Sequence, residues 1–308
     1  MGIKQTLRNS NLVFSTYKKM LKIQKKLMFG MSAIAPVWVS KTQYKSAFKR
    51  KLDLKNPVYF NEKLMWLKFK KYKDDPLVAQ CADKYAVREY IESCGLSHIL
   101  NELYGAWDRA EDIPWDELPE KFAIKCNHGC GFNLICRDKS KFDTVTAGKT
   151  LNKWLKTESW REYAEVHYRH IPPKIICEKF LSGKNDELPV DYKLYCFNGK
   201  VLYIGNFIER NMEEKTLIRG YFDLDWNPSP VFRYPMDASK FSKPINLEKM
   251  IEYAEILSKP FPFVRVDFYE VDGQIVFGEL TFTPTGCLGT YYTDDAHRKL
   301  GDALRLAE

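Results

Sequence analysis

The sequence of 308 residues lacks the run of about 18 apolar residues that a membrane-spanning helix requires. Its most apolar early stretch, residues 27–39, is interrupted by Gly30 and Pro36 and lacks the order of a signal peptide. No two of its eight cysteines form a Cys-x-x-Cys pair. We therefore expect reduced thiols and a cytoplasmic location. Hydrophobic and aromatic contents of 45% and 14% exclude a disordered chain.

Acidic residues are almost absent from the first 73 positions, which hold 18 Lys and Arg but only Asp53 and Glu62. The remaining residues hold 30 basic and 38 acidic side chains. This asymmetry favours contact between residues 1–73 and a polyanion, either an anionic membrane surface or an acidic polysaccharide. The alternative is a solvated, lysine-rich surface. We expect no nucleic-acid partner.

Periodicity predicts helices over residues 12–29, 57–73, 75–95, 143–169 and 246–258. The first is amphipathic and carries Lys18, Lys19, Lys22, Lys25 and Lys26, so it would lie on a membrane surface or pack on the body. Strands are expected at 121–127 and 133–138, which form a hairpin, and at 174–181, 191–210, 263–273 and 274–282. The predicted fold class is α+β, with antiparallel sheet dominating the second half.

The hairpin at 263–282 holds the most specific chemical pattern. Arg265 and Asp267 point to one face of a strand because side chains alternate, and the return across Asp272-Gly273 can bring Glu279 opposite Asp267. Two carboxylates at this separation suit Mg²⁺, which takes its remaining ligands from water and phosphate. Arg265 could then neutralise a transferring phosphoryl group. A surface salt bridge is the alternative.

Five segments occur in an order that is specific when they are taken together. They are Asp83-Lys84 before a helix, FAIK with a glycine loop, ICEKFL with a glycine, DYKLYCFNGKV, and RVDFYEVDGQIVFGELTFTPTG. With these segments the chain resembles the ATP-grasp superfamily, and within it the branch of the teichuronopeptide biosynthesis protein TupA, over most of residues 57–308. The resemblance implies an ATP-grasp fold, in which two α+β subdomains grip ATP.

The resemblance implies nucleotide contacts from three parts of the chain. Lys84 and Lys125 would contact the phosphates, and Lys125 would also take part in catalysis. The loop over the phosphates would be formed by residues 129–133, including Gly129, Gly131, Phe132 and Asn133. The adenine hinge would comprise Glu178, Lys179, Phe180 and Leu181. Asp186 and Glu187 both qualify as the acidic residue that holds the ribose.

The resemblance also implies a metal site and an acceptor face. Asp267, Glu279 and Thr281 would bind Mg²⁺, while Arg265 would stabilise the phosphoryl group and then the tetrahedral intermediate. Asp191, Lys193 and Arg210 would face the acceptor. Thr281 stands where most of the superfamily has asparagine, and a hydroxyl is the weaker metal ligand; the TupA-like branch carries threonine here.

The segment around Cys126, His128 and Cys130 admits a zinc, a redox or a phosphate-loop interpretation. Zinc would need a fourth ligand, and this spacing does not match usual zinc sites. A Cys-x-x-x-Cys pair in a flexible loop does not reliably form a redox centre. Lys125 at the strand end and the adjacent glycines favour a phosphate loop.

These inferences divide the chain into a basic helical region (1–75), a small subdomain with the phosphate loop (76–173) and a C-terminal subdomain with the hinge and metal site (174–308). The first region replaces the domain that usually precedes the grasp. The expected activity is an ATP-dependent carboxylate–amine ligase acting through an acyl phosphate with ATP and Mg²⁺. It would join an amino acid to a uronic acid of a capsule or O-antigen, in the cytoplasm or at the inner face of the membrane. A glycosyltransferase and an ATP-dependent sugar kinase are the alternatives.

Overall fold

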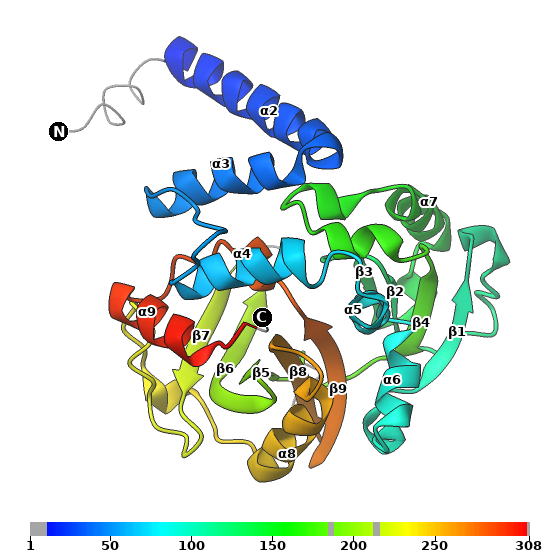
Figure 1. Cartoon of the computed structure of the whole chain (residues 1–308). Helices are drawn as coiled ribbons and strands as arrows, with labels where there is room; N and C mark the ends of the chain where they lie inside the picture. The colour runs from blue at the N-terminus through cyan, green and yellow to red at the C-terminus, as the bar shows by residue number, and fades with distance from the viewer. Residues whose placement is uncertain (1–10, 184–187, 212–215, 307–308) are drawn as a thin grey trace.

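The computed structural model describes residues 11–183, 188–211 and 216–306, which form two antiparallel sheets flanked by helices (Figure 1). The first sheet, sheet A, has the strand order β1 (Leu103–Trp107), β4 (Ile175–Lys179), β2 (Phe122–Cys126) and β3 (Asn133–Cys136). Helix α7 (Thr144–Leu155) packs on it through Leu151, which shares a small core with Phe122 and Ile124. The β2–β3 hairpin matches the prediction. Strand β4 belongs to this sheet, although the C-terminal subdomain was expected to begin at residue 174.

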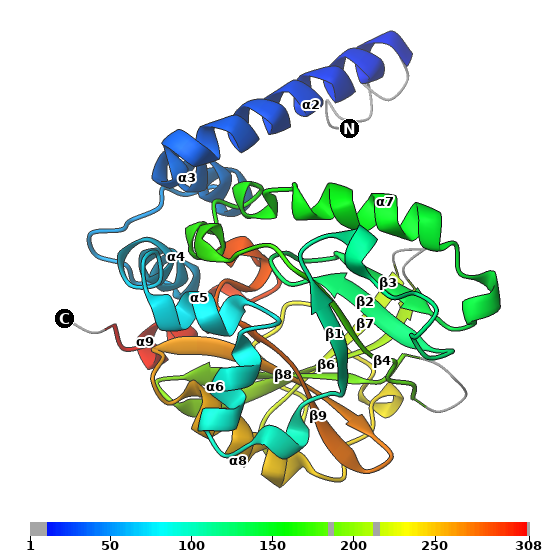
Figure 2. The ribbon, with the colours of Figure 1, turned by 90° about the vertical axis from the view of Figure 1, so that its right-hand side faces the viewer.

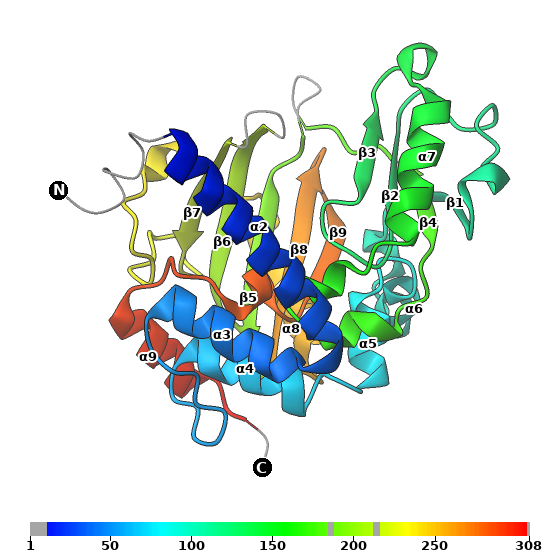
Figure 3. The same ribbon diagram turned by 90° about the horizontal axis from the view of Figure 1, so that it is seen from above.

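The second sheet, sheet B, has the order β7 (Thr216–Phe222), β6 (Lys200–Asn211), β5 (Asp191–Phe197), β8 (Phe263–Val271) and β9 (Gln274–Thr281). Two tight turns fix its hairpins. Asn198-Gly199 and Asp272-Gly273 all have positive φ, between 49° and 78°, as the Asn-Gly and Asp-Gly signals predict. Figure 3 shows the five strands side by side in this order.

The two faces of sheet B have different environments. One face packs on α8 (Leu247–Ser258), where the Cys196 thiol lies 3.8 Å from the Ala254 carbonyl oxygen. Side chains at alternate positions, among them Lys193, Arg265 and Asp267, point away from α8. We call this second face the site face.

Helices α4 (Phe60–Lys70) and α9 (Asp294–Ala303) cover one end of the site face. Phe60 of α4 lies among Phe197, Phe263 and Tyr292, with ring centroids 5.2 to 5.6 Å apart. The ammonium group of the fully buried Lys68 donates to Ser40 Oγ and to the Tyr163 carbonyl oxygen, both at 2.9 Å. These contacts tie α4 to α3 (Pro36–Phe48), which carries Ser40.

The N-terminal helix α2 (Asn11–Ile34) extends beyond the body, as Figures 1 and 2 show. Its C-terminal end is fixed to the body by Ser32 Oγ, which donates to the Arg161 carbonyl oxygen at 2.7 Å. Within the described residues, no helix is both long enough and apolar enough to cross a bilayer.

Two helix predictions are wrong in part. Residues 75–95 form α5 (Pro76–Ala82) and α6 (Val87–Ser93), and Lys84 lies in the break and not on a helix. The break follows from Asp83, whose carboxylate accepts from the Tyr85 N–H and from Asn127 Nδ2. Residues 143–169 hold α7 followed by two short 3₁₀ turns (Ser159–Arg161 and Val166–His170), and Ala164, between the turns, has a positive φ of 51°.

We expect Gly301→Ala to destabilise the protein, although alanine is ordinarily favoured over glycine within a helix. A Cβ at position 301 of α9 would overlap the Val58 carbonyl oxygen, which is backbone and cannot move aside. The expected loss is about 1–3 kcal/mol. Gly30→Ala in α2 is the matched control, because no atom lies within 4 Å of the position that its methyl group would take. Urea unfolding of both variants measures the difference; equal stability would refute the close packing of α9.

Candidate active site

A row of alternating charges crosses three strands of the site face. Asp267 on β8 lies opposite Glu279 on β9 and opposite Lys193 on β5. Arg265 Nε and Nη2 donate to the two oxygens of Asp267, both at 2.6 Å, and Lys193 Nζ lies 2.5 Å from Asp267 Oδ2. Lys193 also pairs with Asp191 at 2.7 Å. The predicted pairing of Asp267 and Glu279 is therefore present.

A β-bulge at Gly278 produces this pairing. Phe268 opposes Phe277, whereas Asp267 opposes Glu279, so Gly278 is an extra residue in β9. The bulge puts Phe277 on the α8 face and Glu279 on the site face, although both are odd-numbered. A Cβ at position 278 would lie 3.0 Å from the Asp267 carbonyl oxygen, which favours glycine there.

The Glu279 carboxylate is held in its ionised form. Burial alone would raise its pKa, but Lys84, Arg265 and Lys193 outweigh burial and, with the Thr281 hydroxyl, lower the pKa to about 2. Arg265 Nη2 donates to Glu279 Oε1 at 3.1 Å and to Thr281 Oγ1 at 3.0 Å, and Thr281 Oγ1 donates to Glu279 Oε1 at 3.0 Å.

Lys84 connects this row to the glycine loop of sheet A. Its ammonium group donates to the Gly129 carbonyl oxygen at 2.8 Å and lies 3.9 Å from Glu279 Oε2. Asn127, at the start of the loop, is fixed by a hydrogen bond in which its Nδ2 donates to Asp83 Oδ1 at 2.8 Å. Lys84 thus connects the glycine loop of sheet A with Glu279 of sheet B.

Lys125, at the end of β2, lies beside the end of β4. Its ammonium group pairs with Glu178 Oε2 at 2.6 Å, and Arg88 Nη1 lies 3.6 Å from Glu178 Oε1. Glu178 therefore has two cationic neighbours. Sequence reasoning missed Arg88, because its partner Glu178 lies 90 positions further along the chain and no local pattern connects the two.

The expected adenine hinge follows Glu178. The Lys179 N–H donates to the Glu102 carbonyl oxygen at 2.9 Å, and the Lys179 carbonyl oxygen accepts from Asn101 Nδ2 at 2.9 Å. That carbonyl keeps a second lone pair for another donor. Phe180 is buried, and the Arg137 guanidinium lies 5.0 Å from its ring centroid.

The glycine loop is closed by its backbone and anchored by Phe132. The Cys126 N–H donates to the Phe132 carbonyl oxygen at 2.9 Å, Gly131 has a φ of +75°, and Asn133 begins β3 opposite Lys125. The Phe132 ring stacks on Trp154 at 5.4 Å, so its side chain fixes the loop to α7.

The two cysteines of the loop have different environments. Cys126 is buried, and burial raises the pKa of its thiol to about 12, whereas Cys130 is exposed. In the described part of the chain, no three or more His, Cys, Asp or Glu side chains are grouped so as to hold a metal.

The donor set of Asp267 and Glu279 fits Mg²⁺ as a site of two carboxylates that leaves the other positions to water and phosphate. Both are oxygen donors on one face, directly opposite one another. Glu279 has the more accessible side chain, 38% exposed, whereas that of Asp267 is 3% exposed and already contacts two cations. The Thr281 hydroxyl is hydrogen-bonded to Arg265 and to Glu279.

Three predicted site residues lie wholly or partly outside the described part of the chain. Asp186 and Glu187 lie outside the described residues. Arg210 lies in β6, but its side chain also falls outside the described part.

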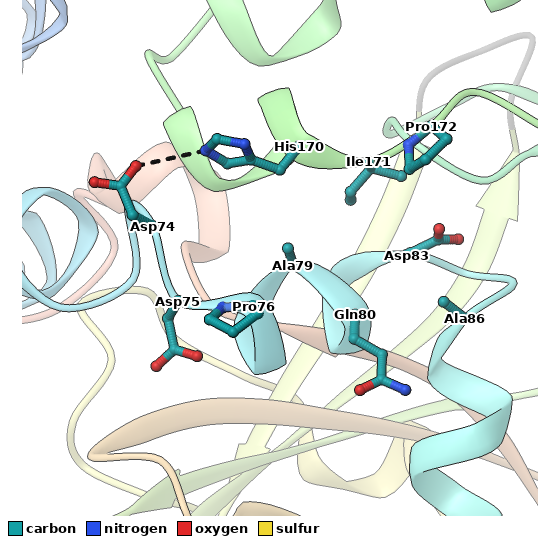
Figure 4. Close-up of a pocket in the computed structure, with 10 residues that line it drawn as sticks. All are labelled: Asp74, Asp75, Pro76, Ala79, Gln80, Asp83, Ala86, His170, Ile171 and Pro172. Atoms are coloured by element: carbon teal, nitrogen blue, oxygen red, sulfur yellow. Dashed lines mark ion pairs between the residues drawn. The ribbon is translucent and has the colours of Figure 1, made fainter.

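A cavity of about 380 Å³ lies beside α5 and contains none of the predicted site residues (Figure 4). Its acidic side chains already have structural partners. Asp75 caps α5 by accepting from two backbone N–H groups, Asp83 bonds Asn127, and Asp74 pairs with His170 at 3.5 Å. The charged row of the site face is the stronger candidate for chemistry.

Comparison with known proteins identifies a family for the chain. The family described as TupA-like ATPgrasp matches residues 62–305. No curated protein sequence matches the chain. Among solved structures, D-alanine–D-alanine ligase from Bacillus anthracis is 16% identical with a TM-score of 0.45, over 74% of this chain and 68% of that one. An L-amino acid ligase from Bacillus licheniformis is 13% identical with a TM-score of 0.43, over 72% and 48%. An ADP complex of N5-carboxyaminoimidazole ribonucleotide synthetase is 15% identical with a TM-score of 0.41, over 72% and 50%.

We expect Asp267→Ala to destabilise the fold far more than Glu279→Ala. The first substitution leaves a cavity between two buried cations, Arg265 with only the partly exposed Glu279 and Lys193 with only Asp191, and removing one partner of a buried ion network costs about 3–5 kcal/mol. The second removes a partly exposed carboxylate and should cost about 1 kcal/mol or less. Urea unfolding followed by tryptophan fluorescence compares the two. Similar losses in both variants would contradict the buried ion network.

Proposed function

The chain belongs to the TupA-like ATP-grasp family, and from this premise we propose that it joins a sugar carboxylate to an amine during surface-polysaccharide assembly. Membership confirms the predicted family, the ATP-grasp fold and an ATP-dependent ligase as the class of enzyme. The ligase acts on a carboxylate and an amine. The identity of the acceptor as a uronic acid of a capsule or O-antigen, and of the amine as an amino acid, is the proposed part.

The observation that carries the proposal is the pairing of Asp267 with Glu279 on the site face, with Arg265 bonded to both. Two carboxylates beside a guanidinium suit the transfer of a phosphoryl group to an oxygen nucleophile. Lys84 and Lys125 supply positive charge from the side of sheet A. Asp267 and Glu279 would hold Mg²⁺, whose positive charge would neutralise the charge that develops on the phosphoryl group.

In the proposed reaction, an oxygen of the substrate carboxylate attacks the γ-phosphorus of ATP, and ADP leaves with the bonding electron pair. The product is an acyl phosphate. The amine then attacks the acyl carbon, inorganic phosphate leaves, and the amine loses a proton. Arg265 Nη2 would stabilise the phosphoryl oxygens and then the tetrahedral intermediate. Lys125, fixed by Glu178, would orient the nucleotide phosphates.

Two other activities use some of the same features. A sugar kinase would transfer the phosphoryl group to a hydroxyl and stop there. A glycosyltransferase would need a sugar-nucleotide site, and the nearest sequence pattern is Asp223-Leu224-Asp225. Asp223 accepts from the Asp225 and Asn227 N–H groups, so its carboxylate stabilises a turn. Membership of the family favours the ligase.

We expect MgATP, a uronic acid and an amino acid to yield ADP, phosphate and an amide. Hydroxylamine should trap the acyl phosphate as a hydroxamate. Lys125→Ala should lower kcat/KM by about 100-fold, because it removes a charge at the phosphates. Tyr234→Ala, at an exposed position outside the site, is the control. A stable phosphosugar without hydroxamate would show that the enzyme is a kinase. Turnover without ADP formation would show that it is neither a ligase nor a kinase.

Helix α2 supports the proposed contact with an anionic membrane surface. Met20, Ile23, Leu27 and Ile34 are 60–82% exposed, and their spacing puts them on one side of the helix. Lysines occupy other sides. Figures 1 and 3 show that α2 crosses on the side of sheet B opposite α8, the side of the site face. An enzyme attached through α2 at the inner face of the membrane would therefore turn its acceptor side toward the surface.

We expect the protein to sediment with vesicles of phosphatidylcholine and phosphatidylglycerol at low salt, and less at about 1 M salt, where the Debye length is about 3 Å. The triple variant Met20→Glu, Ile23→Glu, Leu27→Glu should stay in the supernatant yet keep ADP formation. The control is a second triple variant that introduces the same three negative charges at exposed positions elsewhere: Val145→Glu, Tyr234→Glu, Ile245→Glu. The membrane contact is wrong if the unaltered protein does not sediment, or if both triple variants behave alike.

A further inference from the structure

The carboxylate of Glu165 lies where the end of β9 meets the segment that packs on the glycine loop. Its Oε1 accepts a hydrogen bond from Thr283 Oγ1 at 2.6 Å. Thr283 is two residues beyond Thr281, so their Cα atoms are at most about 7 Å apart. On the side of sheet A, Ser159 Oγ, in the 3₁₀ turn before Glu165, donates to the His128 carbonyl oxygen at 3.3 Å. The segment that carries Glu165 therefore contacts both sides of the site.

The Tyr168 hydroxyl shows that Glu165 and the charged row lie near one another. Burial raises the pKa of this hydroxyl well above its usual value, and the negative charges of Glu165 and Glu279 both raise it further. A charge shifts the pKa of a neighbouring group appreciably only at short range. Glu165 therefore belongs to the same site as Glu279, although 114 positions separate them in the sequence.

Glu165 differs from the other carboxylates of the site because no cation contacts it. Asp267, Glu279 and Glu178 each form an ion pair with at least one Lys or Arg side chain. Among the residues that the structure describes, Glu165 forms no ion pair. Its second oxygen, Oε2, has no hydrogen-bond partner there and is not enclosed. The carboxylate can therefore receive a donor, and preferably a cation, from a ligand.

The surroundings of Glu165 favour a proton acceptor. Burial raises the pKa of its carboxyl group, the Thr283 hydroxyl and the more distant Lys68 ammonium lower it, and Glu162 raises it, so that the net shift is upward. Lys68 itself donates to Ser40 Oγ and to a backbone carbonyl oxygen. A carboxylate whose pKa is raised toward neutrality accepts a proton more readily than an ordinary glutamate.

We propose that Glu165 binds the ammonium group of the amine substrate and accepts a proton from it; this rests on the ligase function proposed above and names the base for its second step. Arg265 Nη2, bonded to Thr281, would hold the acyl oxygen. The amine nitrogen lies about 3–3.5 Å from the acyl carbon before attack and about 2.8 Å from a carboxylate that binds it. A chain of such contacts spans the distance that Thr281 and Thr283 set between Arg265 and Glu165.

The protons of this step balance. The ammonium nitrogen carries three protons and gives one to Glu165, which frees its electron pair. That pair attacks the acyl carbon, and the carbon–oxygen bond to phosphate breaks with its electrons on the phosphate. The departing phosphate takes the second proton and leaves as hydrogen phosphate, and the third stays on the amide nitrogen. Glu165 then releases its proton to water.

Two nucleophiles of different charge test the role of Glu165. Hydroxylamine is uncharged at neutral pH and needs no base, whereas an amino acid carries an ammonium group. With MgATP and D-glucuronate, Glu165→Gln should form hydroxamate as fast as the unaltered protein. It should form amide from a mixture of the common L-amino acids about 100-fold more slowly. The deficit should shrink as the pH rises, because more of the amine is then uncharged.

Three comparisons separate catalysis from structure. Glutamine has the shape of glutamate and keeps an oxygen for the Thr283 hydroxyl, so Glu165→Gln preserves that contact. Glu165→Asp keeps the carboxylate and should restore part of the amide formation. Glu162→Gln removes the same charge at an exposed position three residues earlier and should behave like the unaltered protein. An equal loss of hydroxamate and amide in Glu165→Gln would show a structural role and overturn the proposal.

Binding measurements distinguish the failure of this proposal from failure of the ligase. Saturation-transfer NMR with MgADP present should show at least one of the amino acids bound to the full-length protein, its N-acetylated form bound less, and the binding lost in Glu165→Gln. This result without ADP formation from MgATP supports the ammonium site and refutes the ligase. Hydroxamate formation by a protein that binds no amino acid, or binds them equally after Glu165→Gln, refutes the role of Glu165 and leaves the ligase standing.

Discussion

The structure of the candidate site depends on one buried carboxylate held between two cations. Asp267 is bonded to Arg265 on its own strand and to Lys193 on the next, with almost no access to water. A group of this kind is stable only when the register of its strands is fixed, since a slip of one residue would send its partners to the other face. The hydrophobic contacts of α8 with the opposite face supply that constraint.

The sequence predicted most of the site because its strongest signals are local. Asn198-Gly199 and Asp272-Gly273 determine the hairpins, and alternation then puts Arg265 and Asp267 on one face. The pairing of Asp267 with Glu279 was predicted without the bulge that makes it possible. A regular ladder from Asp272-Gly273 would have placed Asp267 opposite Gly278. The extra residue is revealed only by the strand register in the structure.

Other elements could not be read from local pattern. The predicted helix over 75–95 has continuous helical periodicity, but Asp83 forms a tertiary bond to Asn127 that interrupts it. Strands β1 and β7 and helices α3 and α9 were not anticipated, because each is short or lacks clear alternation and owes its form to its neighbours. Arg88 was missed for a related reason, since its role depends on Glu178, which lies 90 positions away in the sequence.

Each cation of the site has a counter-ion within the protein: Lys84 has Glu279, Lys125 has Glu178, and Arg265 and Lys193 share Asp267. A simple anion that entered would compete with one of these carboxylates for its cation, which offsets part of the attraction between the anion and the cation. A ligand carrying both signs of charge can exchange partners with cations and carboxylates together. The arrangement therefore discriminates by charge distribution and not by net charge alone.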